Sequence, residues 1–476
     1  MMTGATADGW LKPQAAWYFR DEVIAVPQPE AANDPPPLIW LGASQIIDGA
    51  RLSEHGMRLA TDGGDLDLEL CPRHPLNRAY FDVSSHRFLA RRTLRLRGEW
   101  NGKAFVARTF WPGDHCLDQL PTRPQSPPIS TPESLRAWVR SKTGDAANDR
   151  FSVETLWQRA GPLPPAIGAP VIAFILNGAQ GDDDEAHAGH FATAIGTVGE
   201  NGAMHDWLVA NYYTLDSESE KGILASSVPL DNYLGDLNAG QSWYRPSWML
   251  VARLRDPRAA RCLQSAFSTV FDRLYCRRLH YHHASANCAG IIVSTLRALG
   301  WAVPARGPEG WLKAVVALPA TLLASGSLKK AKAAFDYLTE DRTRLYPAAA
   351  FEETGADLLQ LVRGTSRRHL SRFEAMLASD VDEVLLVRLP QFPSSRAWGD
   401  YPVIDSREYH DRLPKNPADR QIVPVGPRPL PPGLEGSGAA RAPLQRSDYA
   451  LIAAALGAGL AWLGSRVLRR RRRSGS

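Results

Sequence analysis

The sequence contains few cysteines and lacks the repeats and glycine-rich motifs that define several large classes of protein. Five cysteines in 476 residues, irregularly spaced, do not make a disulfide framework; they indicate a reducing compartment or a single reactive thiol. No repeat of solenoid or propeller period occurs. Phosphate-loop, dinucleotide-fingerprint and Gly-x-Ser-x-Gly patterns are also absent, so the sequence offers no support for the enzyme classes built on them.

The overall composition is that of a globular protein with little net charge in its body. Hydrophobic residues make up 44% of the chain and charged residues 22%, which allows a sizeable core and excludes wholesale disorder. Six arginines, Arg466 and the run 469–473, lie at the extreme C-terminus. Without them the formal net charge of +5 becomes −1, so charge gives no reason to expect a nucleic-acid partner.

The two ends of the chain carry different membrane signals. Residues 1–13 lack a basic segment followed by an apolar stretch, so a cleavable secretory signal is not expected. Residues 449–468 are apolar or small except for Arg466 near their end, and a helix of about 20 residues crosses a bilayer core. The sequence therefore predicts a single C-terminal membrane anchor, with membrane lipid as a partner.

The orientation of this anchor is left open by two opposing signals. The arginine run 469–473 favours a cytoplasmic tail, whereas the missing signal peptide favours a cytoplasmic body. A simple single span satisfies only one of these. The alternatives are a translocated tail, a helix lying flat on anionic lipid, or an unrecognised export route for the body.

Composition and periodicity predict an α+β protein divided into six parts. Alternating apolar and polar residues predict strands at the N-terminal end, and dense prolines mark a linker and a tether. The expected parts are a β-rich module (1–120, with strands at 66–70, 88–96 and 104–110), a Pro-rich linker with short helices near 133–142 and 152–160 (121–164), a core (165–303), a helical extension with a late strand at 383–389 (304–390), a Pro/Gly-rich tether (391–447) and a membrane segment with an Arg-rich tail (448–476).

The core has the clearest sequence signals. The apolar run 170–177 predicts a buried strand, and 190–198 and 205–214 predict two strands joined by a turn at 199–202. Further strand and helix patterns follow at 248–254 and 257–278. The segment 288–299 predicts an apolar helix that ends at Gly300.

Cys288 is the residue in this core best suited to covalent chemistry. It follows Asn287 and opens the apolar helix, where unpaired N–H groups and the helix dipole stabilise a thiolate. A thiolate nucleophile also needs a base and a group that orients the base. His190 opens one predicted strand and His205 opens the next, so we expect His190 as the base and His205 as the orienting residue. Asn211, His187 and Asp206 are alternatives for the orienting role.

This arrangement resembles the circularly permuted papain-like enzymes. A histidine opening a strand, a polar residue on the next strand and Asn-Cys opening a helix occur in that order in the lecithin:retinol acyltransferase-like proteins and in permuted relatives of NlpC-type peptidases. The resemblance covers residues 165–303 and implies a permuted papain-like core. It implies Cys288 as nucleophile, His190 as base, His205 in the third position and a thioester intermediate. The 82 residues between His205 and Cys288 exceed what the simplest family pattern requires.

Two other interpretations compete with this one. Cys288 would be a buried small apolar residue if its helix merely fills the core. Cys276, His280, His282 and His283 could form a zinc site, but no second ligand pair has a familiar spacing, so no metal or other cofactor is expected.

The resulting hypothesis is a membrane-associated cysteine hydrolase acting on a peptide, amide or ester bond. A lipid acyltransferase would use the same residues with another acceptor. A non-catalytic membrane-tethered scaffold is an alternative from a different class, and a peptidoglycan amidase would require the body to lie outside the cytoplasm.

Overall fold

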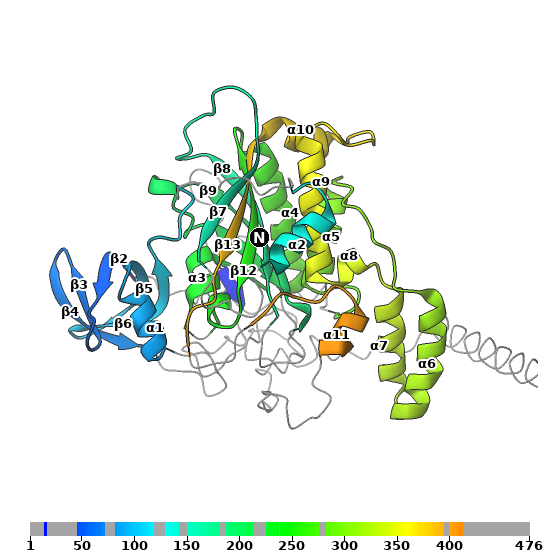
Figure 1. Cartoon of the computed structure of the whole chain (residues 1–476), viewed down its shortest axis with the longest axis horizontal. Coiled ribbons are helices and arrows are strands. Elements are labelled where there is room, and N and C mark those ends of the chain that lie inside the picture. Colours follow the sequence, from blue (N-terminus) through cyan, green and yellow to red (C-terminus); the bar gives the residue numbers. More distant parts are fainter. Residues whose placement is uncertain are drawn as a thin grey trace, which may run out of the picture.

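The computed structural model describes residues 14–16, 45–71, 81–118, 129–141, 150–179, 187–212, 225–237, 239–275, 279, 282–394 and 399–412. Within these ranges the chain has an α+β architecture (Figure 1), as the sequence predicts. An eight-stranded sheet forms its centre, a five-stranded barrel lies to one side, and helices cover the sheet.

The barrel corresponds to the predicted β-rich module. Its strands close in the order β2-β3-β4-β6-β5, and a buried apolar interior that includes Leu68 and Phe105 holds them together. Residues 88–96 are not one strand as expected, because a helix capped by Asp82 runs to Leu89 before the next strand begins. The bounds are β2 Gln45–Leu52, β3 Arg58–Thr61, β4 Gly64–Leu70, α1 Val83–Leu89, β5 Thr93–Asn101 and β6 Ala104–Pro112.

The central sheet is antiparallel throughout, with strand order β1-β11-β10-β9-β8-β12-β13-β7. Its middle strands read as continuous apolar runs because both of their faces are buried. The bounds are β1 Gln14–Ala16, β7 Ser152–Gln158, β8 Pro170–Asn177, β9 His190–Thr197, β10 Leu208–Tyr212, β11 Ala225–Pro229, β12 Ser247–Leu254 and β13 Val381–Leu389.

Helices cover both faces of this sheet. On one face α4, α5 and α9 share a large apolar core with alternate strand residues, and on the other face α3 packs with the remaining alternate residues. The bounds are α2 Pro132–Arg140, α3 Leu230–Gly235, α4 Arg258–Tyr275, α5 Cys288–Ala298, α6 Trp311–Ser325, α7 Leu328–Thr339, α8 Arg342–Leu345, α9 Pro347–Val362, α10 Arg372–Asp380 and α11 Ser406–Arg412, with 3-10 turns at Glu200–Gly202 and Gln241–Trp243.

The sheet gathers strands from more of the chain than the predicted core. β7 falls where a short helix was expected, and that prediction is wrong, because pairing with β13 fixes these residues as a half-buried edge strand. β13 comes from the predicted helical extension. The start of the predicted tether is also part of the body, because Phe392 and Val403 are buried.

The remaining predictions for the C-terminal region concern residues 413–476, which lie outside the described residues. They include the anchor at 449–468 and its arginine run. In the portion that is described, every helix is too short or too polar to span a bilayer.

Buried ion pairs join the barrel to the central sheet. Arg97 of β5 lies 2.6 Å from Asp231 at the start of α3, and Arg108 of β6 lies 2.6 Å from Asp236 just after α3. All four side chains are almost fully buried. Arginine's planar fork satisfies carboxylates in such positions, so these pairs fix how the barrel sits against α3.

Candidate functional site

His190 begins β9 at one end of the sheet, directly opposite Asn177, the last residue of β8. The preceding Gly189 has φ of +75°, and a Cβ there would lie 2.5 Å from the carbonyl oxygen of Asn177. Only glycine fits this tight entry to the strand. The Gly-His step therefore sets where the histidine side chain emerges from the sheet.

His190 is hydrogen-bonded to Asn211 on the neighbouring strand β10. The His190 Nε2–Asn211 Oδ1 distance is 2.7 Å, and both side chains are about 2% exposed. An amide oxygen only accepts hydrogen bonds, so Nε2 carries the proton and Nδ1 is the ring nitrogen that can accept one. Asn211 thus fixes both the orientation and the tautomer of the imidazole.

A second polar group lies on the same face of the sheet. Asn177 donates from Nδ2 to Ser247 Oγ at 2.7 Å, and its Oδ1 accepts a hydrogen bond from the Tyr233 hydroxyl of α3. Asn177, Ser247 and Tyr233 are all buried. The sequence signal for Asn177 is a polar residue that ends an otherwise apolar run, and the sequence-based hypothesis did not use it.

Cys288 is the first residue of α5, as predicted, and it is buried. Asn287 caps the helix, since its Oδ1 accepts the Gly290 N–H at 2.7 Å. Its Nδ2 donates to the carbonyl oxygens of His283 and Leu345 at 2.8 and 2.9 Å. Asn287 therefore ties the start of α5, which carries Cys288, to the preceding loop and to the end of α8.

α5 begins at the same end of the sheet as β9. Near its start, Leu345 packs in one apolar cluster with Ala188, two residues before His190. Beyond its end, the N–H of Ala302 donates to Glu374 of α10, the helix that leads into the first residue of β13. β13 enters the sheet at the end opposite to the start of β9, so the C-terminal end of α5 lies toward that opposite end. Cys288, at the N-terminal end of α5, therefore lies at the same end of the sheet as His190.

The two residues approach this end from different faces of the sheet. Phe191 and Ile195 of β9 share a core with α5, whereas Ala192 and Ala194 belong to the core on the α3 side. Side chains alternate along a strand, so His190 lies on the Ala192 face. A path from the Cys288 sulfur to the His190 ring therefore passes around the start of β9 rather than across the strand.

A segment from the predicted tether closes this end of the sheet. Asp400 forms an antiparallel bridge with Ala179, and the Val403 N–H donates to the His187 carbonyl at 2.9 Å. Gly189 is also tight against Pro402. Residues 399–405, here the closing segment, therefore pack directly on the turn that leads into His190.

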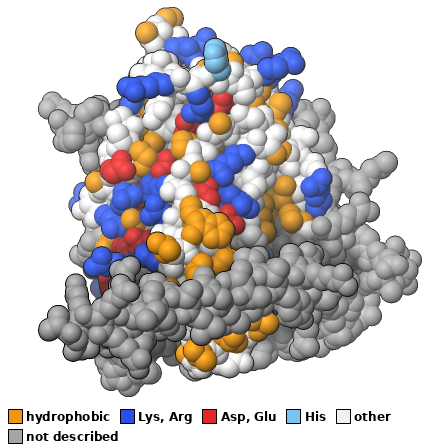
Figure 2. All heavy atoms as spheres, turned by 90° about the vertical axis from the view of Figure 1, so that its right-hand side faces the viewer, with side chains coloured by type: hydrophobic (Ala, Val, Ile, Leu, Met, Phe, Trp, Pro, Cys, Tyr) orange, Lys and Arg blue, Asp and Glu red, His pale blue; other side chains and the backbone are white. Residues whose placement is uncertain are grey.

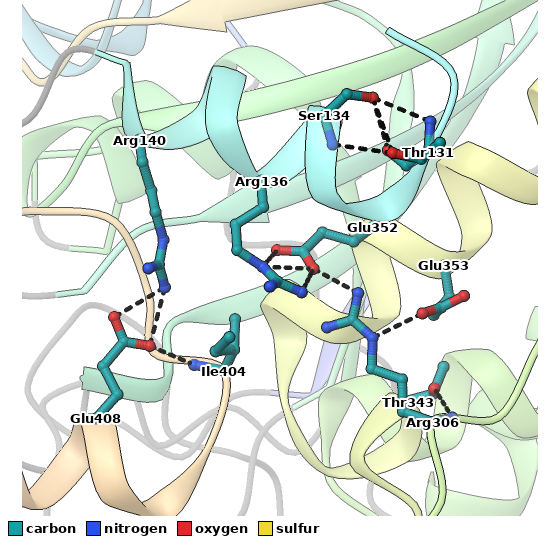
Figure 3. A network of polar contacts seen from close by, with 10 residues as sticks. All are labelled: Thr131, Ser134, Arg136, Arg140, Arg306, Thr343, Glu352, Glu353, Ile404 and Glu408. Atoms are coloured by element: carbon teal, nitrogen blue, oxygen red, sulfur yellow. Dashed lines mark hydrogen bonds and ion pairs between the residues drawn. The ribbon is translucent and has the colours of Figure 1, made fainter.

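Ion pairs between helices hold the closing segment in place (Figure 3). Glu408 of α11 accepts the Ile404 N–H at 3.1 Å and pairs with Arg140 of α2 at 2.8 Å. α2 is tied in turn to α9 by Arg136–Glu352 at 2.7 Å. Arg306 adds two further pairs, to Glu352 and to Glu353.

His205 does not occupy the predicted orienting position. It lies between β9 and β10, beyond the end of β9 that is remote from His190, and its Nε2 is 3.3 Å from Asp206 Oδ2. The partner of His190 is Asn211, one of the three alternatives. The strand register explains this correction. Leu208 pairs with Ile195, so β10 runs toward His190 through Asn211, whereas His205 precedes Leu208 and lies far from His190.

The other two alternatives have different surroundings. His187 lies against Tyr409, with ring centroids 5.9 Å apart. Asp206 pairs with Arg95 and Arg97 of the barrel. Burial tends to raise the pKa of Asp206, but the hydrogen bond with His205 and these arginines hold it well below its usual value.

The zinc interpretation falls partly outside the described residues, because Cys276 and His280 are not described. His282 Nδ1 lies 2.9 Å from Ser285 Oγ. Across the described ranges, no group of three or more His, Cys, Asp or Glu side chains is arranged to hold a metal ion.

Comparison of the chain with protein-family models, with curated proteins and with solved structures finds no match.

Proposed function

We propose that this protein is a cysteine hydrolase of permuted papain-like type, with Cys288 as nucleophile, His190 as base and Asn211 as the residue that orients the base. The observation that carries the proposal is the buried His190–Asn211 hydrogen bond at the end of the sheet where α5 begins with Cys288. The chain order histidine strand, polar strand, cysteine helix supports the permuted arrangement.

The proposed reaction uses these three side chains and water. The reaction requires Cys288 and His190, whose side chains lie on different faces of the sheet, to meet around the start of β9. His190 then takes the Cys288 proton, and the thiolate sulfur attacks the carbonyl carbon of an amide or ester. The bond to nitrogen or oxygen then breaks, and His190 returns the proton to the leaving amine or alcohol. Water activated by His190 hydrolyses the resulting thioester. The Cys288 N–H, at the start of α5, is suited to stabilise the oxyanion.

The test is the pH dependence of iodoacetamide labelling in the full chain, followed by peptide mass spectrometry. We expect Cys288 to label with a midpoint below the usual thiol pKa of about 8.5 and the midpoint to rise in His190→Ala and Asn211→Ala. Exposed Cys262 provides the internal reference, because its midpoint should not change in either variant.

Activity and fold are followed in parallel. Cys288→Ala should abolish turnover of amide, ester and lipid-ester probes while leaving the circular dichroism spectrum and the thermal midpoint nearly unchanged. Transfer of the acyl group to an added lipid instead of water would identify a lipid acyltransferase using the same residues. A Cys288 midpoint equal to that of Cys262, or full turnover by Cys288→Ala, would refute the thiol mechanism and favour a non-catalytic scaffold.

A further inference from the structure

Helices α6 and α7 form a hairpin that extends from the body of the molecule (Figure 1). The helices are joined by Gly326, which has φ of +63° and ends α6. They pack on each other through a small core of Leu318 and Ala331 with Leu322 and Phe335 at its edge. The hairpin's apolar contacts are therefore largely internal, and much of α6 is left facing outward.

The outward face of α6 is apolar. Leu312 and Leu323 are 85% and 86% exposed, and Trp311 and Val316 are also exposed. Positions 312, 316 and 323 lie on one side of a helix, opposite the residues that contact α7. Figure 2, which views the side toward which the hairpin extends, shows hydrophobic side chains gathered in the middle of that face, with both basic and acidic side chains around them.

The hairpin carries a positive net charge. Residues 311–339 contain four lysines and one acid, Asp336. Lys332 is paired with Asp336 within α7, at 2.9 Å, while Lys313, Lys329 and Lys330 are exposed. An apolar face with lysines beside it matches the boundary between acyl chains and anionic headgroups. The 15 residues of α6 span about 22 Å, short of a bilayer core of about 30 Å, which suits a helix lying in the surface plane.

We propose that the α6–α7 hairpin is a docking element for anionic membrane surfaces, with Leu312, Val316 and Leu323 entering the headgroup region. The Trp311 ring packs edge-on against Phe335 of α7 and lies beside this face. Lys313, which follows Leu312 on α6, contacts the lipid phosphates, and Lys329 and Lys330 of α7 add to the positive charge of the hairpin. This binding does not depend on the chemistry proposed for Cys288. It would nevertheless place that site near the lipid, because the hairpin base is anchored there: Glu309 accepts the Tyr346 hydroxyl at 2.8 Å, and Tyr346 packs with Leu345 and Val403.

The test is hydrogen–deuterium exchange of the full chain with vesicles of phosphatidylcholine alone or mixed with phosphatidylglycerol. This local readout separates the hairpin from residues 449–468, which would bind the same vesicles. A two-helix hairpin with a small core opens readily, so its exchange is measurable. We expect exchange in peptides covering 311–325 to slow at least about tenfold with the anionic vesicles.

Two sets of variants measure separately what the apolar residues and the lysines contribute to vesicle binding. The combined change Leu312→Ser, Val316→Ser and Leu323→Ser should abolish the protection. The matched control Val83→Ser with Ile167→Ser, which also alters exposed apolar residues, should retain it. Lys313→Gln, Lys329→Gln and Lys330→Gln together should weaken protection by anionic vesicles on the order of 100-fold in lipid concentration.

Three results would overturn the proposal. The first is vesicle binding with no protection of 311–325, which would assign binding to another segment. The second is strong protection of α6 in the absence of vesicles, which would mean that another part of the chain or a second copy covers this face. The third is equal protection by neutral and anionic vesicles, which would remove the role of the lysines.

Discussion

At the scale of single residues, His115 couples the stability of the molecule to pH. It follows β6, is 3% exposed, and stacks on Phe151 with ring centroids 4.7 Å apart. Burial, opposed by nearby Asp114 and assisted by Arg92, lowers the pKa of its imidazole to about 4. The folded protein therefore keeps His115 neutral under conditions where an unfolded chain would protonate it.

The sign of the pH dependence follows from this difference. The unfolded imidazole titrates near 6.5, so stability is complete above that pH and falls as the pH decreases toward 4. The loss attributable to His115 is on the order of 3 kcal/mol. His115→Phe, which keeps the stacking, should reduce the loss of unfolding free energy between pH 7 and 4.5 in urea titrations. The exposed His55→Gln should not, and equal effects of the two would contradict this assignment.

The residues of the candidate site show what the sequence can and cannot predict at this scale. The local signals at His190 and Cys288 are strong, because each residue begins a strand or a helix directly after a glycine or an asparagine. The choice of Asn211 over His205 depends on strand register, which is set by pairing between β9 and β10. The two strands are separated by a 3-10 turn and further irregular residues, so turn chemistry alone does not determine the register.

At the scale of elements, the start of α5 depends on one side chain. Asn287 caps α5 through Gly290 N–H and also donates to two carbonyl oxygens, one of them of Leu345. We expect Asn287→Ala to lower the unfolding free energy by about 2 kcal/mol, since cap and donors are both lost. Asn287→Ser keeps a capping oxygen and should recover about 1 kcal/mol of this. Equal unfolding midpoints in urea for the two variants would show that the cap itself is not stabilising.

Strands and helices with long apolar runs or clear caps were predictable from the sequence, whereas β7, which has neither, was not. β8, β9, α5 and β13 are confirmed close to their predicted bounds because long apolar runs and clear caps define them. β7 is short and half-buried at the sheet edge, and its partner β13 lies more than 200 residues later in the chain. Its conformation is imposed by tertiary pairing, which overrides weak local preferences.

At the scale of the whole molecule, buried ion pairs make the barrel and the central sheet depend on each other. Arg108→Ala would leave Asp236 buried without its guanidinium partner, and we expect a loss of about 3–5 kcal/mol. Arg58→Ala, which removes an exposed pair with Asp67 in the same barrel, should cost at most about 1 kcal/mol.

Chemical unfolding followed by tryptophan fluorescence would measure both variants. A loss for Arg108→Ala no larger than that for Arg58→Ala would show that the interface between the two parts does not depend on this pair.

The position of β13 bears on the order in which the protein can assemble during synthesis. β13 lies between β12 and β7, so β7 has no neighbour in the sheet until residues 381–389 have left the ribosome. The closing segment that packs on the turn before His190 is made later still. A nascent chain halted before residue 381 would therefore hold two strands fewer than the finished sheet, with an unprotected edge at β12 where partner chains could pair.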